Sequence, residues 1–374
     1  MKYYQSIAVM FGYIIGVGMF GLPYLTNKVG VLSFLLLLVG MAFVQYFCHL
    51  IFASVILETK AYHRLPGYAG IYLGKFWKHL GLLTKVVGNY GSLLAYIVIT
   101  GIFLNQLLAP YFGENILLYA TVLFLAEALI IFFGVKSIGP AELVMTGLLF
   151  LVLGFLCVKG VPHLAISNYH LADWRLFFLP YGAMLFALDG SGAVPLAVKL
   201  LNRDQKATKK VIRISIFGSM FIILFFVLII TGISGDNTTP DALVGLEGIL
   251  SQNIINVALL FGVLTMITSF LGVAEDLRES LSEDYKINKT LAWALTITAP
   301  FLLYLAGVSD LIQIISFTGA VSGSLGVIIL LLIFNKLRKE EKPLKLFKKK
   351  PSLFFIAFLV CLFLAGMVYE VAMF

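Results

Sequence analysis

The sequence predicts an all-α integral membrane protein, and three observations carry that prediction. The chain of 374 residues is 60% hydrophobic and 12% charged, whereas soluble domains are about 45–50% apolar and about 25% charged. Its apolar runs continue for about 20 residues, which is the length of α-helix that crosses a bilayer. Basic residues collect in alternate connections between these runs. Because the runs do not alternate between polar and apolar residues, we expect helices and not the strands of a barrel.

Eleven apolar runs predict eleven membrane-spanning helices. Turn residues or charges separate each run from the next. The first run follows Lys2 without a small-residue cleavage site, so we expect it to remain as a helix and not to act as a signal peptide. In chain order the expected spans lie near residues 6–27, 31–57, 81–107, 115–134, 140–160, 176–199, 211–233, 252–274, 290–307, 309–335 and 352–373.

The distribution of Lys and Arg predicts the orientation of the chain, because basic residues are enriched in cytoplasmic loops. With the N-terminus placed inside, only three of the 27 Lys and Arg fall in outer segments, namely Lys28, Lys159 and Arg175. We therefore expect a protein of the cytoplasmic membrane with a cytoplasmic N-terminus and an outer C-terminus. The net charge of +8 reflects this asymmetry, so we expect no nucleic acid partner. The basic segment 336–350 is expected to be a solvated loop, with contact to anionic lipid as the alternative.

Motifs of soluble enzymes are excluded by their context. The stretch "GVGMFG" at residues 16–21 matches the glycine fingerprint of dinucleotide-binding turns, but the next acidic residue is Glu58 and both flanks are apolar. The fingerprint needs a strand before it and an acidic residue about 20 positions later. The three cysteines lie inside predicted spans, which favours packing over disulfides or metal binding. The spans contain no paired acids, metal-ligand cluster or Ser/His arrangement, so we expect no enzyme.

Two predicted helices carry matching interruptions. "GMFGLPY" at 18–24 and "GSGAVPL" at 190–196 each place a glycine five residues before a proline. Each lies in the first span of a block of five, and the two spans cross the membrane in opposite directions. This pattern predicts an inverted repeat, with a first five-helix half at 1–160, a second at 174–335 and an additional helix at 352–374. A small-residue packing motif, Gly12-x-x-x-Gly16, is the alternative explanation of the first glycine cluster.

Broken helices at membrane depth indicate a binding site. Irregular backbone survives there only where it lines a cavity or is buried in protein. The N-terminal end of a half-helix offers amide groups and partial positive charge, which suit a carboxylate. Freed carbonyl groups suit an ammonium group or a cation. A zwitterion would satisfy both kinds of helix end.

These motifs resemble the amino acid/polyamine/organocation superfamily, in particular the branch of aromatic amino acid permeases and amino acid/auxin permeases. The resemblance covers the whole chain and rests on "GVGMFGLPY", "LPYGAMLFALDGSGAVP", "TMITSFLGVAEDLRESLSEDY" and "LPGYAG". It implies the fold of the bacterial leucine transporter, in which helices 1 and 6 are broken. It also implies secondary transport of a neutral or aromatic amino acid by alternating access, coupled to Na⁺ or H⁺. A channel and a transporter-like amino acid sensor are the alternatives.

The resemblance also implies a substrate site and an ion site. Backbone groups of the first break would bind the substrate carboxylate, carbonyl groups of the second break would face its amine, and two aromatic residues would complete the pocket. The ion site would hold Na⁺ between hydroxyl and carbonyl oxygens of helices 1 and 8, and no other cofactor is expected. The substrate residues would be Gly16, Val17, Gly18, Met19, Tyr90, Phe186, Ala187, Leu188, Asp189 and Gly190; the Na⁺ ligands would be Gly12, Ile15, Thr265, Thr268 and Ser269.

The coupling ion and three single residues have competing interpretations. Some proton-coupled relatives place a lysine of helix 5 at the ion site, but this chain has no lysine between Lys136 and Lys159, so Na⁺ is favoured over H⁺. Asp189 would pair with the substrate amine or carry a proton, or it would cap a half-helix. His49, the one histidine inside a predicted span, is expected to be a satisfied core residue. Glu142 is expected at the membrane interface.

Overall fold

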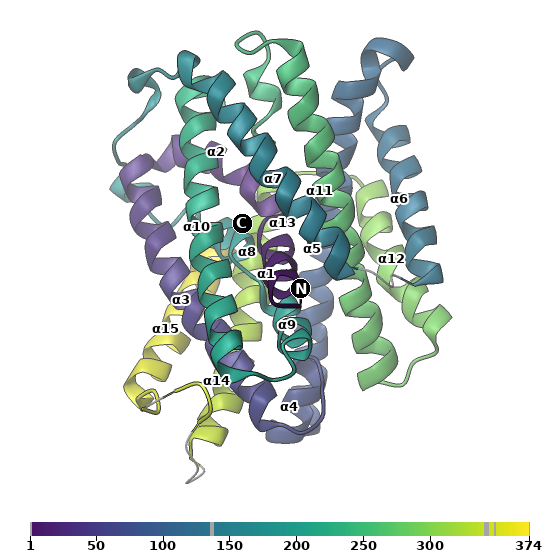
Figure 1. Cartoon of the computed structure of the whole chain (residues 1–374), viewed down its shortest axis with the longest axis vertical. Coiled ribbons are helices and arrows are strands. Elements are labelled where there is room, and N and C mark those ends of the chain that lie inside the picture. The colour runs from purple at the N-terminus through teal and green to yellow at the C-terminus, as the bar shows by residue number, and fades with distance from the viewer. Residues whose placement is uncertain (1, 135–137, 340–343, 348, 374) are drawn as a thin grey trace.

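The computed structural model describes residues 2–134, 138–339, 344–347 and 349–373 (Figure 1). Within these ranges there is no β-strand, and one isolated bridge joins Glu247 and Leu250. The basic residues Lys136, Lys342 and Lys348, which contributed to the predicted orientation, lie outside the described residues. The helices are α1 (Lys2–Ile14), α2 (Val17–Val29), α3 (Val31–Glu58), α4 (Leu65–Leu73), α5 (Lys75–Phe112), α6 (Ile116–Phe133), α7 (Ile138–Gly160), α8 (Tyr181–Ala187), α9 (Val194–Leu200), α10 (Gln205–Ser234), α11 (Gln252–Glu279), α12 (Lys289–Leu305), α13 (Leu311–Phe317), α14 (Ser324–Arg338) and α15 (Leu353–Met373).

The described residues contain nine helical stretches that are long and apolar enough to cross a membrane. The pair α1 and α2, bent by 49° at its break, makes a tenth, and α12 is a shorter apolar helix. Each predicted span contains one of these elements. The third begins six residues before the expected position 81, because α5 starts at Lys75, directly after the short helix α4.

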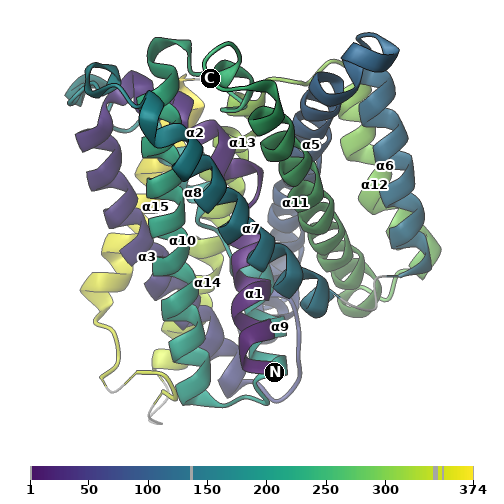
Figure 2. The same ribbon diagram turned by 45° about the horizontal axis from the view of Figure 1, so that its top comes forward.

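The two interrupted helices lie together in the middle of the bundle. Figures 1 and 2 show α1, α2, α8 and α9 at the centre, with α3 and α15 on one side and α6 and α12 on the other. In the most apolar 18-residue stretch of each helix, only 28% of the residues of α6 and 22% of those of α7 are buried. The corresponding shares are 61% in the α8–α9 stretch and 67% in α10. The lipid-facing elements therefore surround a core that contains both breaks.

Glycine lies at the first interruption, and glycine and proline flank the second. The first break falls at Ile15 and Gly16, and α2 then continues through Pro23. The second runs from Leu188 to Gly190, followed by the short 3-10 segment η4 (Ser191–Ala193) and α9, which has Pro195 near its start. A proline without an amide hydrogen is tolerated in the first turn of a helix, which explains why α9 restarts there. Both predicted helix interruptions are confirmed.

Candidate functional site

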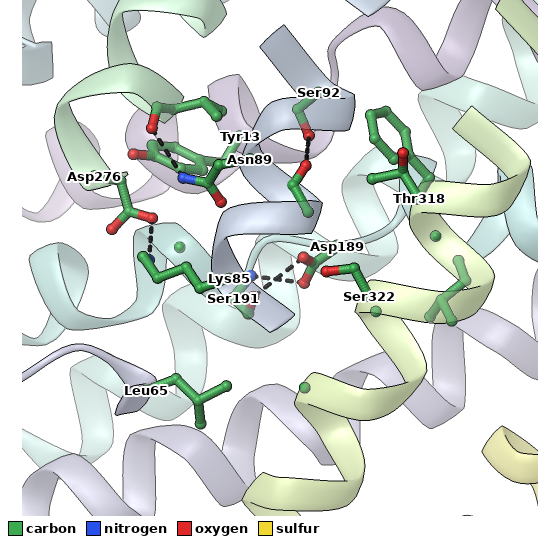
Figure 3. A pocket seen from close by; sticks show the side chains of 18 of the residues that line it. Tyr13, Leu65, Lys85, Asn89, Ser92, Asp189, Ser191, Asp276, Thr318 and Ser322 are labelled. Carbon is green, nitrogen blue, oxygen red and sulfur yellow. Dashed lines mark hydrogen bonds and ion pairs between the residues drawn. The ribbon is translucent and has the colours of Figure 1, made fainter. Parts of the chain in front are cut away.

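A central cavity of about 150 Å³ lies where the two breaks meet (Figure 3). Its walls come from both breaks and from α3, α5, α11 and the π-helical segment η8 (Thr318–Gly323) between α13 and α14. Short π-helical segments occur often at functional sites. The lining includes Gly16, Gly18, Phe186 and Asp189 from the breaks, and Asn89, Ser92, Thr318 and Ser322 from the surrounding helices.

The first break brings backbone close to the cavity. The amide of Gly16 donates to the carbonyl of Ile14 at 3.2 Å, and the amide of Met19 donates to the carbonyl of Gly16 at 3.1 Å. The amides of Val17 and Gly18 are the first of α2, where a helix offers no internal acceptor. The side chains of Val17 and Met19 are buried in the core. This segment therefore presents backbone groups, and not side chains, to the cavity.

Gly18 is a point of close approach between the two broken helices. A Cβ atom built at Gly18 would lie 2.8 Å from the Cα of Ala187 and 2.8 Å from Cδ1 of Phe186. Backbone atoms cannot give way as a flexible side chain can, so only glycine fits this position. The structure thus brings the predicted residues of both breaks together.

The second break is organised by Asp189. Its carboxylate accepts hydrogen bonds from the amide of Ser191 at 2.9 Å and from the hydroxyl of Ser191 at 3.1 Å. Asp189 thus bonds the first amide of η4, but the cap positions of η4 and α9 are Gly190 and Ala193 and carry no side-chain cap bond. The same carboxylate lies at the cavity wall, as Figure 3 shows. The amides of Leu188 and Asp189 still bond to the preceding helical turn, through Met184 and Phe186.

His49 of α3 supports the same break. Its Nε2 accepts a hydrogen bond from the amide of Gly190 at 2.9 Å, and its Nδ1 lies 2.6 Å from the carbonyl oxygen of Gln45. A carbonyl oxygen only accepts, so Nδ1 carries the proton and Nε2 is the acceptor. The imidazole is 1% exposed. His49 is a satisfied core histidine, as expected, but its partner is a backbone group that the helix break releases.

The residues predicted for the ion site lie where α1 meets α11. The hydroxyl of Ser269 donates to the carbonyl of Gly12 at 3.2 Å, and the hydroxyl of Thr268 donates to the carbonyl of Thr265 at 3.0 Å. The hydroxyl of Thr265 is buried and has no partner among the described residues. Ile15 is buried directly before the break. The structure therefore joins Gly12 to Ser269, whereas Thr268 bonds within its own helix.

Two residues lie elsewhere than the sequence indicated. The hydroxyl of Tyr90 donates to the carbonyl of Leu295 in α12 at 2.6 Å, and Tyr90 packs beside the small cluster of Leu277, Leu281 and Ala292. It is not among the residues that line the cavity. Glu142 is not at the interface but is 2% exposed, with its carboxylate against Gly12.

Charged residues separate the central cavity from a second cavity of about 340 Å³. Asp276 of α11 pairs with Lys85 of α5 and with Arg64, whose NH1 lies 2.9 Å from Oδ1 of Asp276. Arg64 also pairs with Glu279 and donates to the carbonyl of Gly192 at 3.1 Å. Arg64, Asp276 and Tyr13 line both cavities. Burial opposes the charge of Arg64, but Asp276 and Glu279 more than compensate and raise its pKa above the usual value.

Residues 1–370 match the family model described as the tryptophan/tyrosine permease family. A curated relative, the tyrosine-specific transport system 1 of Haemophilus influenzae, is 25% identical over 296 residues, which are 74% of this chain and 72% of that protein.

Two solved structures are similar over nearly the whole chain. A nucleobase-cation-symport-1 family transporter with bromovinylhydantoin bound has a TM-score of 0.69 and 9% identity, covering 100% of this chain and 93% of the other. MhsT in complex with L-phenylalanine has a TM-score of 0.66 and 16% identity, covering 98% and 97%. These similarities confirm the predicted fold, that of the bacterial leucine transporter.

Proposed function

The chain belongs to the tryptophan/tyrosine permease family, and on this premise we propose that it carries an aromatic amino acid across the cytoplasmic membrane by alternating access, driven by a coupled cation. As a member of that family, this multi-pass membrane protein is an amino acid permease and not an enzyme. The proposal concerns the substrate, the coupling and the direction of transport.

The observation that carries the proposal is the contact of the two helix breaks at one cavity, through Gly18 and Ala187. In the proposed complex, the substrate carboxylate binds backbone amides at Gly16, Val17, Gly18 and Met19. Those of Val17 and Gly18 have no acceptor in the helix, whereas those of Gly16 and Met19 would exchange their present carbonyl acceptors for the carboxylate. The substrate ammonium binds the carbonyl groups of the second break and the carboxylate of Asp189. No ion pair of Asp189 occurs within the described part of the chain, so its charge is available to the substrate.

The remaining cavity wall supports an aromatic side chain. Phe186 offers a ring face, and aromatic pairs are favourable in edge-to-face or offset geometry. Ser92, Thr318 and Ser322 also line the cavity and offer hydroxyl groups, which suit a phenol hydroxyl or an indole nitrogen. The names of two similar proteins point the same way, since one transports tyrosine and the other was solved with L-phenylalanine.

The coupling ion of the proposal is Na⁺ or H⁺. The expected Na⁺ ligands Gly12, Ile15, Thr265, Thr268 and Ser269 would hold the ion at the α1–α11 contact through their oxygen atoms, and oxygen ligands suit a hard cation. In alternating access, the half at 174–335 would move against the half at 1–160, with the N-terminus in the cytoplasm and α15 as an addition. The ion pairs of Arg64 would then border the inner route from the cavity.

Transport by purified protein in liposomes tests the proposal. We expect saturable uptake of labelled tyrosine or tryptophan, competition by other aromatic amino acids, and counterflow when the liposomes are preloaded with unlabelled substrate. Non-saturable flux without counterflow would instead indicate a channel. Specific binding in a thermal-shift panel of amino acids, without counterflow, would indicate a sensor.

A further inference from the structure

Glu142 is a buried carboxylate at a place that the sequence did not indicate. It lies in the second turn of α7, which packs against both α1 and α11 (Figure 2). A Cβ atom built at Gly12 would lie 1.8 Å from Oε2 of Glu142 and 2.3 Å from its Cδ. The carboxylate therefore rests on the backbone of α1, four residues before the break at Gly16, and only glycine leaves room for it.

No basic side chain neutralises this carboxylate within the described part of the chain, because Glu142 takes part in none of the ion pairs found there. The titratable groups that face it are Tyr13 of α1 and Tyr96 of α5. Both are neutral phenols.

Several charged groups on two neighbouring helices have partners of their own. On α11, Asp276 pairs with Lys85 and Arg64, and Glu275 pairs with Arg278. On α10, Lys210 lies over the ring of Tyr3. An ionised carboxylate that is buried without a partner is strongly disfavoured, so Glu142 needs a cation from outside the chain.

Oxygen atoms suited to a hard cation lie on α1 and α11, the two helices against which α7 packs. The carbonyl of Gly12 is in contact with the hydroxyl of Ser269. One turn away on the same face of α11, the hydroxyl of Thr265 is buried and has no partner among the described residues. The five ligand oxygens expected from the resemblance are all neutral. The carboxylate of Glu142 would add the negative charge that they lack. Small monovalent cations prefer such hard, anionic oxygen sites.

We propose that the carboxylate of Glu142 binds the coupling cation, a small hard monovalent cation, at the junction of α1, α7 and α11. The cation is either Na⁺, which the neighbouring oxygen atoms would also coordinate, or H⁺, which would protonate the carboxylate; both neutralise its buried charge. The inference rests on the proposed function, because it assumes that a cation gradient drives transport. When the cation is bound, Glu142 is neutralised and α1 packs against α7; without it, the buried charge disfavours that packing. Cation binding is thereby linked to the position of the first helix break.

The test compares wild type, Glu142→Gln and the matched control Glu127→Gln in proteoliposomes. Glu127 is also a buried carboxylate, 3% exposed, but it belongs to the peripheral helix α6. Accumulation of labelled tyrosine is measured under an inward Na⁺ gradient at equal pH, and under an inward H⁺ gradient without Na⁺. Counterflow exchange is measured in parallel at equal, saturating cation concentrations on both sides, because exchange needs bound substrate and cation but no cation gradient.

We expect one gradient to drive accumulation by the wild type. Glu142→Gln should lose about 10- to 150-fold in apparent affinity for that cation, and should therefore lose accumulation while keeping exchange. Glu127→Gln should behave like the wild type. The Na⁺ arm and the H⁺ arm identify which cation Glu142 binds. Gly12→Ala, whose Cβ would displace the carboxylate, should reproduce the loss of coupling and shows that the effect comes from this contact.

Full gradient-driven accumulation by Glu142→Gln would overturn the inference, as would an equal loss in Glu127→Gln. If Glu142→Gln also loses exchange, the melting temperatures of wild type and variant are compared with and without the driving cation. A cation-induced rise in melting temperature that occurs in the wild type but not in the variant supports the site. An equal rise in both proteins overturns the inference. Exchange by the wild type without accumulation under either gradient would overturn this inference but not amino acid transport. Absence of exchange from the wild type would overturn the proposed function itself.

Discussion

His49 and Gly190 are joined across two helices by a hydrogen bond of 2.9 Å from the amide nitrogen of Gly190 to Nε2 of His49. The bond replaces a helical acceptor that the break between α8 and α9 removes. An unsatisfied amide in the membrane interior is costly, because neither water nor lipid can replace the acceptor. His49 is therefore a positioning residue, which fixes the carbonyl groups next to Asp189 without touching the proposed substrate itself.

The first prediction follows from that bond. His49→Leu leaves the amide of Gly190 without an acceptor, which costs about 1–3 kcal/mol, so we expect a lower melting temperature and weaker binding of tyrosine. His49→Gln retains a side-chain acceptor and should recover part of both losses. Thermal unfolding and ligand titration of the purified variants measure these effects. Wild-type binding by His49→Leu would show that the break holds its shape without the imidazole.

The second prediction separates the two roles of Asp189. Asparagine caps a helix N-terminus about as well as aspartate, so Asp189→Asn should keep the bond from the amide of Ser191 and a near-normal melting temperature. Loss of a charge-assisted bond to the substrate ammonium costs about 1.5–3 kcal/mol, or about 10- to 150-fold in affinity. Tyrosine titration and uptake at several pH values measure that loss. Uptake within about twofold of wild type would leave Asp189 as a structural cap.

The third prediction concerns the contact of the two breaks. Gly18→Ala adds a Cβ atom 2.8 Å from the Cα of Ala187, which forces the half-helices apart, so we expect a large loss of uptake with insertion into the membrane retained. Gly40→Ala is the matched control, because a Cβ atom there meets nothing within 4 Å. Membrane fractionation and uptake of both variants test the contrast. Normal uptake by Gly18→Ala would place the substrate elsewhere.

The sequence located the helix breaks but not the side-chain partners around them. "GMFGLPY" and "GSGAVPL" predicted both interrupted helices, since glycine and proline act on the backbone directly and leave a local signal. The first break nevertheless falls at Ile15 and Gly16, just before "GMFGLPY", and Pro23 lies inside α2. The sequence indicated Tyr90 at the substrate pocket and Glu142 at the membrane interface, and the structure places both elsewhere. The reason is that a membrane helix is apolar both where it faces lipid and where it faces protein. Hydropathy therefore does not show which face packs inward. The pairing of Lys85 with Asp276 depends on the packing of α5 against α11, for which sequence spacing offers no signal.

The fourth prediction distinguishes two neighbouring hydroxyl groups on α11. Ser269 bonds to the carbonyl of Gly12 across the helix interface, whereas Thr268 bonds to Thr265 within α11. Ser269→Ala should therefore weaken the apparent affinity for the coupling cation by about 2- to 12-fold, the value of one net hydrogen bond. Thr268→Ala should have a smaller effect. Uptake measured over a series of Na⁺ concentrations and pH values gives both affinities, and the reverse order would restore Thr268 as the main ligand.

The last prediction concerns Asp276, which is 4% exposed and pairs with both Lys85 and Arg64. Asp276→Asn leaves two cations facing a neutral amide, and Arg64 alone keeps a second partner in Glu279. Removing one partner of a buried ion pair costs about 3–5 kcal/mol. Lys85→Met should cost less, because Asp276 then still pairs with Arg64. Among the single variants, we therefore expect the melting temperature to fall most in Asp276→Asn. The double variant Lys85→Met with Asp276→Asn should be more stable than Asp276→Asn alone, because the second substitution removes the unpaired ammonium group of Lys85. Strictly additive losses in this cycle would show that Lys85 and Asp276 are not energetically coupled.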